Sequence, residues 1–208
     1  MAQQAPAAAA EAARVPHRRR IGILALQGDV REHAEAVREV GADPIEVRLP
    51  RDLVGLDALI LPGGESTTMR RLIDLYALRE PIVALARGGA PVYGTCAGMI
   101  LLARRIADGD EPVFGLLDIT VQRNAYGRQL DSFEADLAIP SLGDDPMHGV
   151  FIRAPLVSEL GADVEVLAVD PLGRPIAVRQ GRVLATAFHP ELTADRRLHR
   201  LLLEMIDQ

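Results

Sequence analysis

The sequence predicts an α/β fold in three layers, with a mostly parallel central sheet flanked by helices and extra mixed or antiparallel strands in the C-terminal half. Three observations predict it. Apolar runs as long as buried strands alternate with segments of helical periodicity through the first half of the chain. Strand-like runs then follow one another, separated by turn residues. The chain has 208 residues and is 49% hydrophobic, which is enough for one domain with a full core.

The first half of the chain alternates expected strands with expected helices. A continuous apolar run at 21–26 is typical of a strand buried on both faces of a parallel sheet. Apolar residues then recur at helical spacing from Val30 to Val40, and Gly41 follows in the position of a C-cap. The same alternation predicts, in chain order, strands at 44–49 and 56–62, a helix at 66–79, a strand at 91–95 and a helix at 97–107.

The second half is rich in strands and closes with an amphipathic helix. The expected strands lie at 133–139, 149–154, 164–169, 175–180 and 183–188, and the expected helix at 194–208. There is no internal repeat, and no linker is long enough to separate two domains. We therefore expect a single domain over residues 21–208.

The first 20 residues differ in composition from the rest. They are alanine-rich, and their arginines come last, whereas a signal peptide places positive charge before an apolar stretch. We predict a disordered tail over residues 1–20 and a cytoplasmic protein. The single cysteine excludes an internal disulfide, and no apolar run is long enough to span a membrane.

The charged residues exclude several kinds of chemistry. A net charge of −6 argues against nucleic acid as a partner. All 23 basic side chains are arginine, so the chain can neither form a lysine Schiff base nor supply a P-loop lysine. The histidines are scattered and the thiol is single, so we expect neither a metal site nor a cofactor.

The only cysteine lies in a run of small residues, Gly-Thr-Cys-Ala-Gly at 94–98. A lone cysteine is most often a small buried hydrophobe, but here a strand ends and a helix begins, as in a nucleophile elbow with cysteine in the serine position. The sharp turn requires small residues two before and two after the nucleophile, as Gly94 and Gly98 are. The helix N-terminus stabilises a thiolate, and the amide of Ala97 points to where an oxyanion would form. The motif predicts that Cys96 is an acyl-transfer nucleophile, without indicating a substrate.

A thiolate nucleophile needs a base, and His189 is the candidate. It stands at the end of a strand-like run, and Glu191 follows two residues later, on the same side of an extended segment. Glu191 can therefore orient and polarise the imidazole in the manner of a Ser-His-Asp triad, with Pro190 stiffening the link. We expect the other histidines to be structural or solvated: His17, His33, His148 and His199.

A glycine turn at 61–67, Leu-Pro-Gly-Gly-Glu-Ser-Thr, follows another expected strand. Two glycines let backbone amides approach a ligand, so Gly63 and Gly64 are candidates for the second oxyanion donor. Ser66 or Thr67 is expected to cap the next helix. Taken alone, the segment is equally consistent with an ordinary glycine turn.

Together these motifs resemble the triad-type, class I glutamine amidotransferases. More specific segments, Arg-Asn-Ala-Tyr-Gly-Arg-Gln-Leu-Asp-Ser-Phe-Glu-Ala-Asp-Leu at 123–137 and Gly-Val-Phe-Ile-Arg-Ala-Pro at 149–155, resemble the glutaminase subunit of pyridoxal 5′-phosphate synthase. The resemblance runs from about residue 21 to the C-terminus. Asp29 stands where that family is expected to have a small residue such as alanine, and its charge is expected to affect docking of the synthase.

The resemblance implies hydrolysis of L-glutamine to L-glutamate and ammonia, which passes to a separate synthase subunit that builds pyridoxal 5′-phosphate. It implies that Cys96 attacks the carboxamide, that His189 transfers the proton and that Glu191 orients His189. The amides of Gly64 and Ala97 are implied as the oxyanion hole. The residues implied to hold glutamine are Gly64, Glu65, Ser66, Arg123, Ile152 and Arg153.

Three other functions remain open at this point. The nearest is the glutaminase subunit of another pathway, such as imidazole glycerol phosphate synthase, although the segments 123–137 and 149–155 argue against it. A cysteine hydrolase or stress-response protein on a similar fold would not need glutamate two residues after histidine. A non-catalytic module that binds a partner would not need an intact Cys96–His189–Glu191 set.

Overall fold

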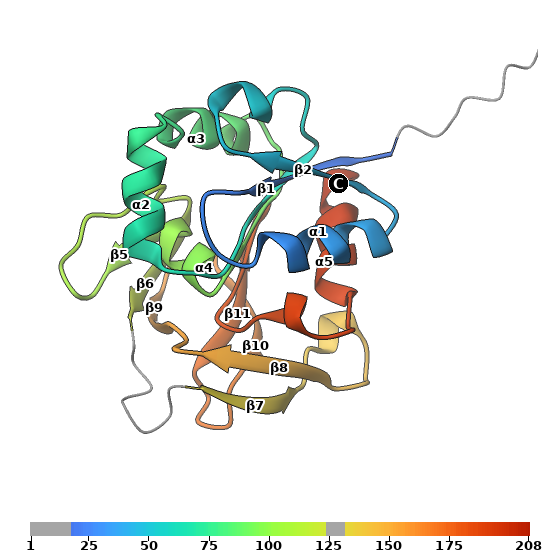
Figure 1. Cartoon of the computed structure of the whole chain (residues 1–208). Helices are drawn as coiled ribbons and strands as arrows, with labels where there is room; N and C mark the ends of the chain where they lie inside the picture. Colours follow the sequence, from blue (N-terminus) through green and yellow to red (C-terminus); the bar gives the residue numbers. More distant parts are fainter. Residues whose placement is uncertain (1–17, 124–131) are drawn as a thin grey trace, which may run out of the picture.

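The computed structural model describes residues 18–123 and 132–208, and its centre is a seven-stranded sheet (Figure 1). The strand order is β10-β11-β12-β4-β3-β1-β2. The strands are β1 (Arg20–Leu24), β2 (Asp43–Val47), β3 (Ala58–Leu61), β4 (Val92–Thr95), β10 (Glu165–Val169), β11 (Pro175–Gln180) and β12 (Val183–Thr186). The pairs from β12 to β2 are parallel, and β10, β11 and β12 pair antiparallel.

Helices cover both faces of this sheet. Helices α1 (Val30–Glu39) and α5 (Arg197–Ile206) lie together on one side, and α2 (Ser66–Leu75) and α4 (Ala97–Leu102) lie on the other (Figure 1). The strands at the centre of the sheet are covered on both faces, and every residue of β3 and β4 is buried. The predicted α/β class is therefore confirmed, including the parallel centre and the antiparallel strands of the C-terminal half.

Two smaller sheets, formed by strands between residues 103 and 160, extend the domain. One contains β5 (Ala103–Ile106), β6 (Leu117–Gln122) and β9 (Leu156–Leu160), and the other pairs β7 (Ser132–Leu137) with β8 (Met147–Ile152). Short 3-10 helices lie at Pro50–Leu53, Pro140–Leu142 and Pro190–Leu192. Strand β8 matters for the site, because the backbone amide of His189 donates to the carbonyl of Val150, 2.9 Å away.

Several elements differ from those predicted from the sequence. The helix expected at 97–107 ends at Leu102, and β5 follows at once because its residues pair with β6 and Arg105 binds Asp118 and Thr120. The helix expected at 66–79 ends at Leu75, before Ala77, whose φ is 53°, and a separate helix, α3 (Arg79–Arg87), follows. Strands β6 and β9 and helix α3 were not expected at all.

The first described strand begins close to its predicted position. Strand β1 begins at Arg20, one residue before the predicted strand, and the amide of Arg20 donates to the Asp57 carboxylate at 2.7 Å. The rest of the predicted tail, up to residue 17, lies outside the described residues, as does most of the specific segment 123–137. Among the helices that are described, none is long and apolar enough to cross a membrane.

Candidate active site

Cys96 lies on a strained turn between β4 and α4. Its φ of 48° and ψ of −101° belong to a conformation that non-glycine residues rarely adopt. The turn is tight: a Cβ added at Gly98 would lie 2.0 Å from the carbonyl oxygen of Leu61, and one at Gly94 would lie 2.5 Å from the carbonyl carbon of Gly98. The small residues around Cys96 therefore have a steric cause, as expected for a nucleophile elbow.

The sheet brings His189 to Cys96. Strand β12 pairs with β4 so that Thr186 lies opposite Thr95, and the amide of Cys96 donates to the carbonyl of Thr186 at 2.8 Å. His189 follows three residues after the end of β12. Both side chains line the same cleft, although they are 93 residues apart in the sequence (189 − 96).

Glu191 lies directly behind His189. Its Oε1 is 2.8 Å from His189 Nδ1, and both residues are almost completely buried. The opposite ring nitrogen, Nε2, is the one left for Cys96; it is buried and has no hydrogen-bond partner among the described residues. The Cys96 thiol instead points to the carbonyl of Ile152, with Sγ 3.7 Å from the oxygen. The three predicted triad residues are thus assembled, with the sulfur turned toward β8.

A second carboxylate reaches the same imidazole nitrogen. Asp29 Oδ2 lies 3.1 Å from His189 Nδ1, and Asp29 is partly exposed. Donor atoms of Asp29, His189 and Glu191 all lie within 4.8 Å of one another, a grouping of the type that can hold a metal ion. The hydrogen bonds to Nδ1 already account for this arrangement, because an imidazole N–H and carboxylates satisfy one another.

The electrostatics of the pair favour a charged histidine. Burial acts to lower the pKa of His189, but the hydrogen bond to Asp29 and the interactions with Cys96 and Glu191 outweigh it and raise that pKa to about 12. Burial acts to raise the pKa of Glu191, but His33 and His189 outweigh it and lower that pKa well below its usual range. An imidazolium beside Cys96 stabilises negative charge on the sulfur.

The glycine turn packs directly against the imidazole. A Cβ at Gly63 would lie 2.3 Å from His189 Cε1, so only glycine fits there. The carbonyl of Gly63 accepts from the amide of Asp29 at 3.2 Å, and the amide of Glu65 donates to Gln27 Oε1 at 2.6 Å. These contacts tie the predicted oxyanion loop to the segment that follows β1.

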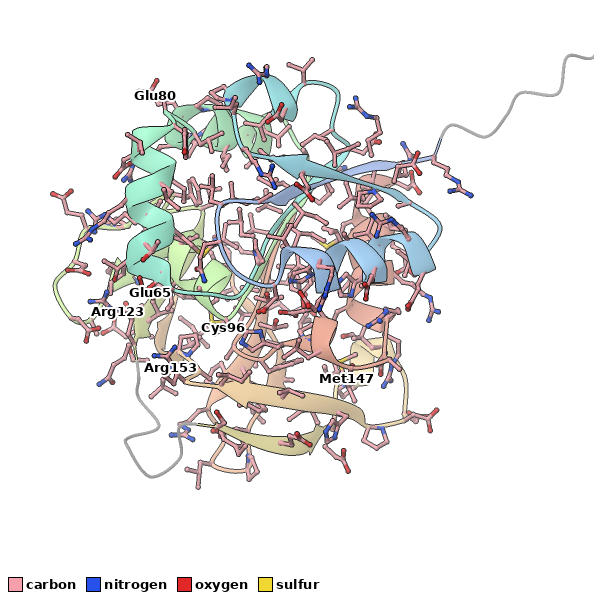
Figure 2. The ribbon with its side chains drawn as sticks, viewed as in Figure 1. Glu65, Glu80, Cys96, Arg123, Met147 and Arg153 are labelled. Carbon is pink, nitrogen blue, oxygen red and sulfur yellow. The ribbon has the colours of Figure 1, made fainter. Side chains whose placement is uncertain are left out.

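The site opens into a cleft of about 400 Å³ that contains the predicted substrate-binding residues. Figure 2 shows Glu65, Arg123 and Arg153 around Cys96, on the side away from Met147. The cleft is lined by Gln27, Asp29, Gly64, Glu65, Ser66, Thr67, Cys96, Ala97, Ile100, Asp108, Arg123, Ile152, Arg153 and His189. We call Glu65, Arg123 and Arg153 the rim.

The rim carboxylate Glu65 is used as a helix cap. It accepts from the amides of Thr67 and Thr68, at 3.0 and 2.7 Å, and from the Thr68 hydroxyl at 2.6 Å. The Thr68 hydroxyl is the main cause that lowers the pKa of Glu65 to about 2. The expectation that Ser66 or Thr67 caps α2 was wrong. Glu65 is the N-cap, because its side chain reaches the amides of Thr67 and Thr68 in the first turn.

The two rim arginines are constrained in different ways. Arg123 is held by two carboxylates, with Nε 2.9 Å from Asp108 and Nη2 2.8 Å from Asp110. Arg153 has a φ of 45°, an unfavourable conformation for a residue with a side chain. Neither arrangement was indicated by the sequence.

Three side chains that contact the predicted triad were not recognised as part of the site. Asp29 bonds His189, the Thr95 hydroxyl donates to Glu191 Oε1, and His33 Nε2 lies 3.5 Å from the same oxygen. His33 and His199, expected to be structural or solvated, are both fully buried. The sequence did indicate that His33 is buried. It is three residues after Val30 and four before Val37, so it lies on the helix face expected to be apolar.

Comparison with known proteins now decides the family. The family model described as the SNO glutamine amidotransferase family matches residues 23–208. The chain belongs to the SNO glutamine amidotransferase family. The predicted resemblance is therefore confirmed, over nearly the whole of the predicted domain.

Relatives and solved structures agree with this membership. The chain is 57% identical over 189 residues to pyridoxal 5′-phosphate synthase subunit PdxT of Frankia alni, covering 90% of this chain and 94% of that one. It is 56% identical to the protein of the same name from a Roseiflexus species, covering 89% and 99%. A crystal structure of a glutamine amidotransferase superposes with a TM-score of 0.85 at 49% identity, covering 90% and 99%. The structure of PurLQS from Thermotoga maritima, at 18% identity and a TM-score of 0.65, covering 90% and 98%, shares the fold alone.

Proposed function

We propose that this glutamine amidotransferase hydrolyses L-glutamine through Cys96, His189 and Glu191, and that it delivers the ammonia to a synthase subunit that makes pyridoxal 5′-phosphate. The observation that carries the proposal is a strained cysteine elbow whose cleft also contains a buried histidine–glutamate pair. The relatives from Frankia alni and Roseiflexus are subunits of pyridoxal 5′-phosphate synthase, which favours this function over imidazole glycerol phosphate synthase.

The reaction begins when the Cys96 thiol gives its proton to His189 Nε2, which forms a thiolate and an imidazolium. The sulfur attacks the carboxamide carbon, and the amides of Gly64 and Ala97 hold the oxyanion that forms. As the C–N bond breaks, His189 gives its Nε2 proton to the nitrogen, which leaves as ammonia and a glutamyl thioester remains. The neutral ring then takes a proton from water, whose oxygen attacks the thioester. Breaking the S–C bond releases glutamate and restores the ion pair.

Glu191 keeps its charge throughout the cycle. Its carboxylate accepts the Nδ1–H of His189 at 2.8 Å, which aims Nε2 into the cleft and stabilises the imidazolium. Asp29 accepts from the same nitrogen at 3.1 Å and supplements this role. No cofactor takes part in these steps.

Glutamine is held by the lining of the cleft in this proposal. Arg123 and Arg153 suit the α-carboxylate, and Gly64, Ser66 and the backbone of Ile152 provide polar contacts. The Glu65 side chain acts through the cap of α2, which fixes the turn that carries Gly64, rather than by facing the α-ammonium. Asp108, which also lines the cleft, is the carboxylate available for that ammonium.

Ammonia must leave unprotonated and protected from water, so the acceptor is proposed to be a docked synthase subunit. Free turnover would waste glutamine, and we propose that the Gly63–Gly64 loop becomes productive only in that complex. The cytoplasmic location expected from the composition of the first 20 residues belongs to the same proposal.

The test is release of glutamate and ammonia from L-glutamine by wild type and Cys96→Ala, each with and without the synthase subunit. We expect release that requires Cys96 and rises when the synthase is present. Release that needs Cys96 but ignores the synthase would overturn the gating and leave the glutaminase. Release by Cys96→Ala at the wild-type rate would overturn the assigned nucleophile.

A further inference from the structure

A chain of buried polar side chains runs from Glu191 away from the cleft, into the layer between the sheet and helices α1 and α5. Its members are Thr95 at the end of β4, His33 on α1 and His199 on α5, and each is at most 1% exposed. The proposed reaction uses none of them. Buried polar groups of this kind are costly unless each is paired, so their arrangement calls for a physical account.

The distances link the members into one series. His199 Nε2 lies 3.1 Å from His33 Nδ1, and His33 Nε2 lies 3.1 Å from Thr95 Oγ1. The Thr95 hydroxyl donates to Glu191 Oε1 at 3.4 Å. That oxygen is the one that accepts from His189 Nδ1.

The direction of each hydrogen bond follows from the two ends of the series. Burial is the main cause that lowers the pKa of His199 to about 3, so this ring is neutral and carries one N–H. Its Nδ1 is buried without a partner among the described residues, whereas its Nε2 faces His33. The hydrogen therefore sits on Nε2, where it has an acceptor, since an orphaned buried donor is rarer than an orphaned acceptor.

The Glu191 end gives the same direction. The ionised carboxylate only accepts, so the single hydroxyl proton of Thr95 points to it. Thr95 Oγ1 must then accept from His33 Nε2–H. This leaves His33 Nδ1 as the acceptor that His199 requires, so both ends assign the same tautomer to His33.

We propose that His33 and Thr95 are positioning residues that fix the Glu191 carboxylate from behind, so that its Oε1 faces His189 in a single orientation. The inference rests on the proposed role of Glu191. All the donors point toward that carboxylate, which stabilises its negative charge without giving it a proton. His199 completes the series by fixing the tautomer of His33.

The strand supplies a matched pair of substitutions and a control. Thr95→Val keeps the shape of the side chain and removes the hydroxyl, whereas Thr95→Ser keeps the hydroxyl. Tyr93→Phe removes another buried hydroxyl two residues earlier on β4, one that bonds Thr186 at 3.2 Å instead of Glu191. His33→Leu and His33→Gln form a second pair, because the glutamine amide can donate where Nε2 does.

The experiment measures kcat and KM for glutamine hydrolysis in the complex with the synthase subunit, together with thermal unfolding of each variant. Loss of one hydrogen bond to a charged group is expected to lower kcat roughly tenfold in Thr95→Val with KM unchanged. Thr95→Ser and His33→Gln are expected to recover most of the rate that Thr95→Val and His33→Leu lose. Tyr93→Phe is expected to lower the unfolding temperature without changing kcat.

A double-mutant cycle separates positioning from a structural role. If Thr95 acts through Glu191, Thr95→Val causes no further loss of kcat in a Glu191→Gln background. An equal loss in both backgrounds, or a Thr95→Val enzyme with the wild-type kcat, would overturn the inference. Full activity of Glu191→Gln itself would instead overturn the proposed triad.

Discussion

Cys96 and His189 of the proposed catalytic triad line the same cleft as the rim, yet triad and rim are built in different ways. Cys96, His189 and Glu191 are all buried and are fixed by the pairing of β4 with β12 and by hydrogen bonds to buried groups. The rim side chains lie on turns and loops, and two of the three are engaged elsewhere. Glu65 caps α2, and Arg123 is bound to Asp108 and Asp110.

The side chains of the proposed triad are therefore held in place in the isolated chain, whereas Arg123 on the rim is not free to bind substrate. The charged pair of His189 and Glu191 is buried against a packed sheet, so it needs no reorganisation when the reaction begins. An arginine held by two carboxylates must exchange them for the substrate carboxylate, which weakens binding until something else favours the exchange. We propose that docking of the synthase favours this exchange.

The largest expected effect lies in the triad. Glu191→Gln is expected to lower kcat roughly 10³- to 10⁴-fold, because an amide no longer stabilises the imidazolium. Asp29→Asn should lower it less than roughly tenfold, because Asp29 is partly exposed and its contact is longer. Steady-state kinetics of both variants in the complex measure this, and equal losses would show that the two carboxylates share the role.

The next effect tests the elbow that supports the triad. Gly98→Ala is expected to lower the free energy of unfolding by about 3 kcal/mol, because its Cβ would meet the Leu61 carbonyl at 2.0 Å. Gly41→Ala is the control, since nothing lies within 4 Å of its Cβ and only its φ of 85° is unfavourable, a change worth about 1 kcal/mol. Chemical denaturation compares them, and similar losses would contradict the steric account.

The third effect lies on the rim. Arg123→Ala is expected to raise KM for glutamine roughly 10- to 100-fold with a smaller change in kcat, because it removes a charge-assisted contact to the substrate carboxylate. Asp110→Asn removes one of the competing carboxylates and should lower KM about two- to threefold, the size of a partly exposed ion pair. A rise in KM for Asp110→Asn would mean that the carboxylates orient Arg123 for binding.

The smallest effect is the helix cap. Glu65→Ala is expected to lower the free energy of unfolding by about 1 kcal/mol at neutral pH. The folded-state pKa of Glu65 is lowered to about 2, so its contribution is fully present above its ordinary value near 4.5 and is lost as pH falls toward 2. Unfolding of wild type and variant at pH 7, 4 and 2 should therefore show a difference that disappears in acid. A difference that persists at the lowest pH would contradict the cap.

The local geometry around Cys96, His189 and Glu191 could be predicted because its requirements are local. A cysteine between small residues at a strand–helix junction, and a glutamate two residues after a histidine, fix geometry within a few residues. The central sheet was predicted for the same reason, since parallel buried strands read as apolar runs. Membership of the amidotransferase family was predicted from the resemblance that these motifs carry together with the segments 123–137 and 149–155, and the match of the family model confirms it.

The contacts that the sequence did not reveal join distant segments. His33 and Glu191 are 158 residues apart (191 − 33) and meet only because α1 covers the face of the sheet where the 190–192 turn ends. Likewise α4 ends early because β5 finds a partner in β6. The cap of α2 was assigned to the wrong residues, because Glu65 can reach the amides that Ser66 and Thr67 would otherwise serve.

If the triad is formed in the isolated chain and the rim is not, the isolated chain should bind L-glutamine weakly even when no hydrolysis can follow. Isothermal titration calorimetry would measure the Kd of L-glutamine for Cys96→Ala, alone and in complex with the synthase subunit. We expect binding at least about tenfold weaker for the isolated chain, because Arg123 must first leave Asp108 and Asp110. Equal affinity in the two states would contradict it.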